Sequence, residues 1–297
     1  MSRPGGTKFV LRKRWESIFC TAEQREDEKD STPFLQIARY NYLYLHVLED
    51  HSQLNCVNGL CCMWDSLSTR PVAIFNLSTR EVRFLPSIDE EFSPCNCSLG
   101  FEREEEKFKV FSRYKGRHWV FTVGIDKSWR NTKSISFAIP YFKPSVCISG
   151  VIYEFIIKGA IAAIDVKSET IALWNSTHES VYHYELIEVK GKLEVIDYRK
   201  WVNGYLDLWI LDQTPQRKWE WHIIGVPSIW NAIKPRFVSS FMTHNGEISF
   251  VIILKSGACL CYDFTRKSWR ELKIMELPKE NYIRGIYSYV ESLVSLG

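Results

Sequence analysis

A repeated strand–turn–strand unit constrains the fold of this chain more than any other feature. In each copy an apolar run ends on Asp or Asn, and an apolar residue follows six positions later. An Asp or Asn side chain can accept a hydrogen bond from the backbone about two residues on, so each unit predicts a β-hairpin. Three copies share the register, and a fourth, which contains Pro215, is one residue longer. The copies are Val72–Asn76 with Val82, Ile161–Asp165 with Ile171, Cys259–Asp263 with Trp269, and Trp209–Asp212 with Trp219.

A turn glycine followed by an apolar strand precedes each copy. These glycines are Gly59, Gly150, Gly191 and Gly246, and each lies before the Asp or Asn that ends the next strand. Glycine adopts positive φ at little steric cost, which suits a tight hairpin turn. The whole unit is therefore a glycine turn, a strand, a loop, a second strand, an Asp or Asn turn and a third strand.

The spacing of the units predicts the architecture. Successive glycines are unequally spaced, but Leu99-Gly100 divides the longest interval, between Gly59 and Gly150, into two parts of similar length. The resulting period is roughly 40 to 50 residues with about four strands per unit, which is typical of propeller blades. We therefore predict an all-β fold, a β-propeller-like domain of roughly five to seven blades.

Composition limits the class of protein. The chain has 297 residues, of which 45% are hydrophobic and 14% aromatic, enough for one large all-β domain. A formal net charge of +3 is too small to indicate a nucleic-acid partner. No apolar segment reaches the length of a membrane span, which needs about 18 residues or more, so no membrane partner is predicted.

The sequence contains no recognisable catalytic or metal site. Its nine Cys and seven His show neither zinc-type spacing nor a His-Glu-x-x-His motif, and no nucleophile elbow or phosphate loop is present. We predict no catalytic residue, no metal and no cofactor, and a protein that is not an enzyme. A catalytic site assembled from several loops would leave no local motif, so that alternative stays open. Reduced thiols are expected, which indicates the cytoplasm, the nucleus or both.

The N-terminal segment has a different pattern. Leu11, Trp15 and Ile18 fall at helical spacing with basic residues between them, which predicts a short amphipathic helix over residues 8–20. Residues 22–33 carry alternating charge without an apolar anchor, which is typical of a linker. Strands begin after Pro33.

Several stretches together resemble a known family. Val57–Cys61, Ile74–Arg80 and Leu85-Pro86 resemble the opening of plant F-box-associated, kelch-like domains, and Tyr287–Leu296 resembles their ending. The resemblance covers about residues 34–297, which we assign to the F-box-associated domain. In that family the domain follows an F-box that docks on a Skp-type adaptor of a cullin complex.

The resemblance also suggests a role for the N-terminus. Leu11–Ile18 resembles only the last helix of an F-box, so residues 1–21 are interpreted as a remnant of that helix and residues 22–33 as a charged linker. Leu11, Trp15 and Ile18 would then contact the adaptor. The alternative is that Trp15 and Ile18 pack an N-terminal helix against the propeller.

Two functions follow from this interpretation. The first is the substrate-recognition subunit of a Skp–cullin–F-box (SCF-type) ubiquitin ligase, which binds a protein substrate through the propeller while its partners supply the transfer chemistry. The alternative is a free-standing protein-binding propeller, or an inactive truncated paralogue, that does not dock on the adaptor. The sequence does not identify substrate-binding residues, because each aromatic residue also has a packing explanation.

Overall fold

The structure is a computed structural model in which strands account for nearly all regular structure. It describes residues 8–13, 18–26, 33–42, 52–65, 71–88, 96–114, 117–132, 143, 145–156, 159–174, 183–211, 218–228, 238–244, 247–252, 258–275 and 283–296. Within these residues, 24 strands form five sheets. The chain divides into two compact units, of which unit 1 is Met1–Leu45 with Ile187–Val290 and unit 2 is His46–Leu186 with Glu291–Gly297.

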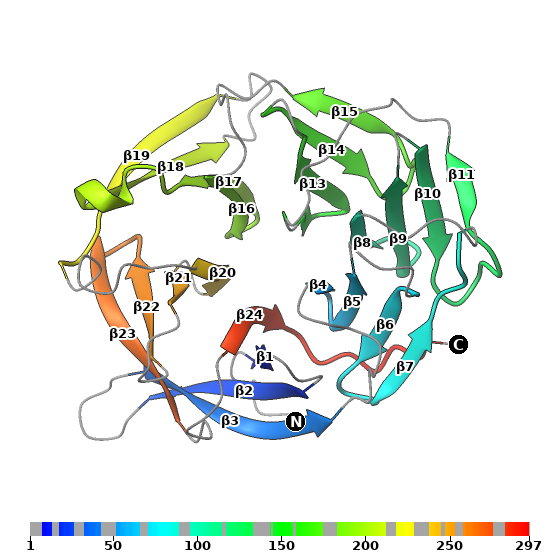
Figure 1. The fold of residues 1–297 in the computed structure, drawn as a ribbon, viewed down its shortest axis with the longest axis horizontal. Coiled ribbons are helices and arrows are strands. Elements are labelled where there is room, and N and C mark those ends of the chain that lie inside the picture. Colours follow the sequence, from blue (N-terminus) through cyan, green and yellow to red (C-terminus); the bar gives the residue numbers. More distant parts are fainter. Residues whose placement is uncertain are drawn as a thin grey trace. The chain divides into compact units, whose positions relative to one another are not determined.

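Unit 2 contains three four-stranded antiparallel sheets, in each of which the strands follow one another in chain order (Figure 1). The first sheet is β4 (Ser52–Val57), β5 (Leu60–Asp65), β6 (Ala73–Asn76) and β7 (Glu81–Phe84). The second is β8 (Asn96–Glu102), β9 (Lys107–Tyr114), β10 (Arg117–Thr122) and β11 (Arg130–Thr132). The third is β12 (Val146–Ile148), β13 (Val151–Phe155), β14 (Ile161–Asp165) and β15 (Ile171–Trp174).

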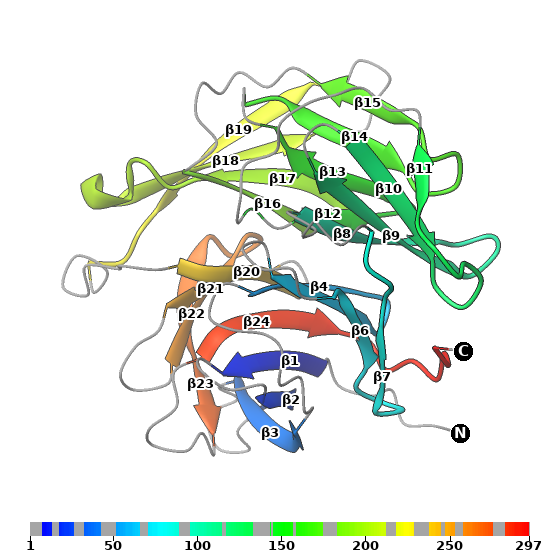
Figure 2. The ribbon, with the colours of Figure 1, turned by 45° about the vertical axis from the view of Figure 1, so that its right-hand side comes forward.

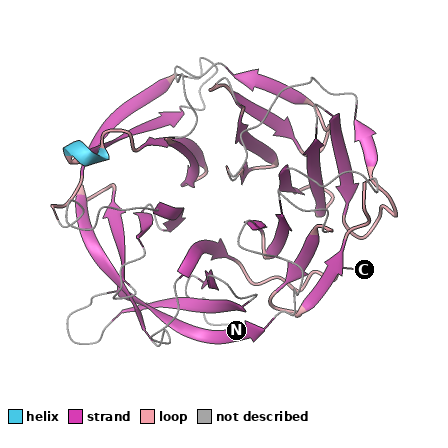
Figure 3. Ribbon diagram, in the orientation of Figure 1, coloured by secondary structure: helices cyan, strands magenta, loops and turns pink. Residues whose placement is uncertain are grey.

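Unit 1 accounts for the other two sheets. One comprises β16 (Tyr184–Val189), whose first residues fall in unit 2, β17 (Lys192–Asp197), β18 (Tyr205–Leu211) and β19 (Trp219–Gly225), with the 3-10 turn η1 (Trp201–Asn203) before β18. The other has eight strands in the order β20-β21-β22-β23-β3-β2-β1-β24. Their bounds are β20 (Val238–His244), β21 (Glu247–Ile252), β22 (Ala258–Asp263), β23 (Ser268–Met275), β24 (Ile283–Tyr289), β1 (Lys8–Lys13), β2 (Ile18–Glu26) and β3 (Pro33–Tyr42). Figure 3, coloured by secondary structure, shows strands throughout the described residues and the short helical turn η1.

The eight-stranded sheet consists of two antiparallel groups of four strands, β20 to β23 and β24-β1-β2-β3, joined by a parallel pairing of β23 with β3. The described residues therefore hold five sheets built from six blade-like groups of four strands. Both numbers lie within the expected range of roughly five to seven, and the prediction of an all-β propeller-type fold is confirmed. In this sheet β24, near the end of the chain, pairs with β1 at its beginning.

The predicted N-terminal helix is wrong. Lys8–Lys13 form β1 between β2 and β24, and Ile18–Glu26 form β2. Phe9 and Val10 are both fully buried, as adjacent residues of a strand covered on both faces must be. Pairing with strands from both ends of the chain overrides the local helical spacing. The predicted linker is also partly wrong, because residues 22–26 complete β2; residues 27–32 lie outside the described part.

The repeat register is confirmed at the level of backbone angles. Arg80, Glu169 and Lys267 each lie four positions after the turn Asn or Asp, and their φ angles are 63°, 60° and 51°. The glycine turns place two consecutive residues at positive φ, as in Asn58-Gly59 (45° and 84°). Ser149-Gly150 and Lys190-Gly191 do the same. Asp212 and Gly246, in the remaining copies, lie outside the described residues.

Each face of the β8–β11 sheet is covered by another sheet of unit 2. One face contributes Leu99, Val110 and Phe121 to a buried cluster shared with the β4–β7 sheet. The other face contributes Phe111 and Val120 to a cluster shared with the β12–β15 sheet. Figure 2 shows β13 and β14 alongside β9 and β10.

Gly100 sets how closely two of these sheets approach. A Cβ atom at Gly100 would lie 2.6 Å from Val166 Cγ2 and 2.9 Å from Ile152 Cδ1, closer than van der Waals contact permits. Both neighbours belong to the buried cluster between β8–β11 and β12–β15. Glycine at this position therefore allows the two sheets to pack closely.

The packing predicts the outcome of a matched pair of substitutions. Gly100→Ala should lower the free energy of unfolding by about 1–3 kcal/mol, because the methyl group overpacks a closely packed interface. Gly225→Ala, where an added Cβ meets nothing within 4 Å, should change it by less than about 0.5 kcal/mol. Urea unfolding of both variants measures the difference, and equal stabilities would contradict the close approach at Gly100.

Candidate functional site

Two of the three residues predicted to bind an adaptor, Leu11 and Ile18, lie on the strands β1 and β2. Leu11 is on β1, where its backbone pairs with Cys20 of β2 and Ile286 of β24. Ile18 begins β2 and pairs with Tyr42 of β3. Trp15 lies outside the described residues. The structure therefore brings Leu11 and Ile18 onto neighbouring strands of one sheet and does not present them on a helix.

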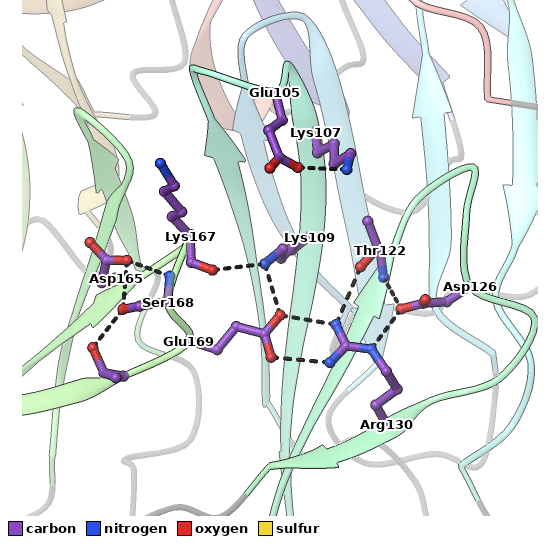
Figure 4. Close-up of polar contacts among 11 residues, drawn as sticks. Glu105, Lys107, Lys109, Thr122, Asp126, Arg130, Asp165, Lys167, Ser168 and Glu169 are labelled. Carbon is purple, nitrogen blue, oxygen red and sulfur yellow. Dashed lines mark hydrogen bonds and ion pairs between the residues drawn. The ribbon is translucent and has the colours of Figure 1, made fainter.

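A network of charged side chains joins the β8–β11 and β12–β15 sheets (Figure 4). The Arg130 guanidinium donates two hydrogen bonds to the Glu169 carboxylate, 2.9 Å from Nη2 to Oε1 and 3.1 Å from Nη1 to Oε2. Lys109 Nζ donates to the same carboxylate at 2.8 Å and to the backbone oxygen of Lys167 at 3.3 Å. Asp126 accepts from Arg130 Nε at 3.2 Å and from the Thr122 backbone N–H at 2.7 Å.

The charges of this network satisfy one another. Burial would raise the pKa of Glu169, but the hydrogen bonds from Arg130 and Lys109 outweigh it and hold the pKa below its usual value. Glu169 in turn raises the pKa of Arg130. Bidentate pairing of this kind fixes geometry as well as contributing energy. We interpret the network as a structural contact that holds two sheets together, because its charged groups already pair with one another within the protein.

A buried ion pair lies in the same inter-sheet contact. Arg113 of β9 pairs with Glu154 of β13, and Ser98 Oγ accepts from Arg113 Nη2 at 2.6 Å and donates to Glu154 Oε2 at 3.2 Å. Burial raises the pKa of Glu154 although Arg113 opposes the shift. Removing one partner of such a pair would leave an uncompensated buried charge. Across the described residues, no group of three or more His, Cys, Asp or Glu is arranged to hold a metal ion.

The best candidate for a protein-binding surface is the aromatic edge, formed by Tyr205 and Trp209 of β18 with Trp221 and Ile223 of β19. Trp221 and Ile223 are 50% and 57% exposed, and β19 is the outermost strand of its sheet. The rings of Trp209 and Trp221 stack with centroids 6.0 Å apart. Lys200 Nζ lies 5.7 Å from the Tyr205 ring and 6.0 Å from the Trp221 ring, and it pairs with Asp207 at 2.9 Å.

The aromatic edge combines features that protein partners use. Exposed Trp and Tyr side chains are the commonest energetic anchors of protein interfaces. In addition, an edge strand carries backbone groups that can pair with an incoming strand. Sequence reasoning missed this surface, although the alternation Trp219-x-Trp221-x-Ile223 could have indicated a strand with one apolar face.

A buried carboxylate lies within the same sheet. Glu194 of β17 comes two residues before Ile196, on the face of the strand that packs against a buried cluster. It is 4% exposed, and its Oε2 atom has no hydrogen-bond partner within the described residues. Burial raises the pKa of Glu194 to about 8, with Lys192 opposing the shift.

This burial predicts a pH dependence of stability. The folded state retains a proton on Glu194 that the unfolded chain releases near its ordinary pKa, so stability falls as pH rises from about 4.5 to about 8. Glu194→Gln should stabilise the protein relative to the unmodified chain by about 3 kcal/mol more at pH 8 than at pH 5. Urea unfolding at both pH values measures this. Glu220→Gln, at a side chain 65% exposed, serves as the control. A difference that does not grow with pH would contradict the assignment.

Comparison with known proteins agrees with this architecture. The consecutive four-stranded antiparallel sheets define a propeller-type protein. Residues 7–293 match the model of the F-box associated beta propeller domain. The chain belongs to this family. The match begins before β1, so the stretch compared with an F-box helix lies within the propeller domain.

Curated relatives point in the same direction. One putative F-box protein of Arabidopsis thaliana is 25% identical over 83% of this chain and 66% of its own length, and another is 29% identical over 77% and 58%. The chain thus spans about three-fifths to two-thirds of the length of these relatives. Among solved structures, TolB from Acinetobacter baumannii aligns with a TM-score of 0.54 at 12% identity, covering 96% of this chain and 66% of that one, which shows similarity of fold alone. No helix in the described part is long and apolar enough to cross a membrane.

Proposed function

We propose that this chain is the substrate-recognition part of a Skp–cullin–F-box (SCF-type) ubiquitin ligase. The observation that carries the proposal is the family match over residues 7–293, together with relatives described as putative F-box proteins. The family membership implies a recognition role. Binding to a Skp-type adaptor, to a cullin and to a protein substrate is the more specific part of what we propose.

In this role the chain binds and does not catalyse. Sheets packed face to face hold their connecting loops and edges in fixed positions, so a surface can vary while the core is retained. The aromatic edge on β18 and β19 is the candidate substrate surface, with Trp221 as its most exposed aromatic anchor. Partner proteins would supply the ubiquitin transfer, in the cytoplasm, the nucleus or both.

The adaptor contact is proposed through the N-terminal residues Leu11, Trp15 and Ile18. A second candidate function is a free-standing protein-binding propeller that does not dock on the adaptor. One observation favours it: Lys8–Lys13 and Ile18–Glu26 are strands paired within a sheet, so they do not present the helix that an F-box would use.

Co-precipitation with a purified Skp-type adaptor distinguishes the two functions. If the ligase role is correct, the full chain should retain adaptor in a stoichiometric amount, and Trp15→Ala and Ile18→Ala should each reduce retention at least about tenfold, on the order of 1.4 kcal/mol. Trp221→Ala, on the aromatic edge, serves as the matched control and should leave retention unchanged. Thermal melts check that all variants are folded.

A relative with an intact F-box provides the positive control for the same experiment. If that relative retains the adaptor and the present chain does not, the ligase role is overturned in favour of the free-standing propeller.

A further inference from the structure

The last residues of the chain lie as an extended segment on the β6–β7 hairpin of unit 2. We call residues Glu291–Leu296 the tail; it contains no regular secondary structure. Figures 1 and 2 both show the red segment that follows β24 running to β7. The tail belongs to unit 2, whereas the preceding strand β24 belongs to unit 1. The tail does not continue a sheet, and the hydrogen bonds that join it to the hairpin each involve a hairpin side chain.

Four hairpin side chains hold the tail, mainly through its backbone. Asn76 Nδ2 donates to the backbone oxygens of Ser292 and Val294, at 2.9 Å each. Glu81 accepts from the Leu296 backbone N–H at 2.9 Å, and Arg83 Nη1 donates to the Leu296 backbone oxygen at 2.8 Å. The two longer contacts are Ser292 N–H to Ser78 Oγ at 3.3 Å and Ser295 Oγ to Glu81 Oε1 at 3.2 Å.

One tail side chain is buried. Leu296 is 3% exposed and joins the core cluster that includes Val72, Ile74 and Leu85. By contrast, Leu293 is 88% exposed. The hairpin therefore recognises an extended backbone with a single Leu anchor, whose burial removes an apolar side chain from water. None of these contacts uses a chain terminus, so a segment inside a longer protein could make them.

The turn residue of this hairpin differs from its counterparts in a way that fits a binding role. Asn76 Oδ1 accepts from Ser78 N–H at 2.9 Å, as Asp165 accepts from Ser168 N–H at 2.7 Å and Asp263 from Thr265 N–H at 2.8 Å. A carboxylate would suffice for the turn. Only an amide can also donate hydrogen bonds, and Asn76 uses its NH₂ group entirely on the tail.

We propose that the β6–β7 hairpin is a peptide-binding site. Its ligand is an extended segment of a protein partner with the pattern of the tail, namely two backbone carbonyls two residues apart followed two residues later by Leu. The tail occupies the site in the isolated chain, and a partner segment of this pattern displaces it. The site is independent of the ligase role, because none of its residues belongs to the proposed adaptor contact or to the aromatic edge.

Replacement of the tail by a free peptide of the same sequence tests the proposal. A protease recognition sequence is inserted into the full chain between Val290 and Glu291, where Val290 is 65% exposed, and is cleaved after folding. A fluorescent peptide of residues 291–297 is then added, and its anisotropy is measured. The peptide should bind saturably and displace the cleaved tail. The peptide carrying Leu296→Ala should bind at least tenfold more weakly.

Two substitutions in the chain form a matched control. Asn76→Asp keeps the acceptor that the turn needs but removes both donated hydrogen bonds, so it should weaken peptide binding at least tenfold. Asp165→Asn makes the reverse change in the equivalent turn and should leave binding unchanged. Equal binding by all variants and both peptides would overturn the proposal, as would no binding to a cleaved chain that remains folded and has lost its tail.

A second measurement does not depend on cleavage. A peptide with a photoreactive group at position 295, whose side chain contacts Glu81 of the hairpin in the tail, is incubated in excess with the intact chain and irradiated. Adducts should map to the β6–β7 hairpin and decrease on addition of unlabelled peptide. Adducts spread over other strands, or none, would overturn the proposal even if the cleaved chain unfolds.

Discussion

The structure depends on one constraint: a sheet with two apolar faces must be covered on both. In unit 2 the β8–β11 sheet meets this requirement, because Leu99, Val110 and Phe121 face one neighbouring sheet and Phe111 and Val120 face the other. The close approach at Gly100 then brings polar groups of adjacent sheets within bonding distance, as in the network around Glu169. Apolar packing thus positions the charged pairs, which add geometric precision to the contact.

Two of the stretches that carry the family resemblance contact each other in the folded chain. The stretch containing Asn76 and Ser78 is far in sequence from the stretch containing Ser292 and Leu296, yet the two contact each other directly. A turn motif and a C-terminal motif are therefore two halves of one interaction. The chain belongs to the F-box associated beta propeller family. This interaction shows that the β6–β7 hairpin holds an extended segment of its own chain.

The hairpin register could be predicted from the sequence because it is local: an Asp or Asn turn, and a glycine at positive φ, are chosen by residues within one unit. The strands of the N-terminal segment could not be predicted in this way. Leu11 fits a helix by spacing, but its strand pairs with Ile286, a partner near the other end of the chain that no local pattern reveals. The aromatic edge was missed because a Trp such as Trp221 is as compatible with a buried core as with an exposed surface. Only the order of the strands shows that β19 is an edge.

Hydrogen–deuterium exchange on the unmodified full chain tests the central claim, that sheet packing and tail capture together make unit 2 one folded structure. The amides of β9 and β10, which are paired on both sides within the covered sheet, should exchange slowest. The Leu296 amide, bonded to Glu81, should exchange much more slowly than that of Leu293. Exchange of the tail at the rate of a free peptide, or of β9 and β10 at the rate of loops, would contradict the account.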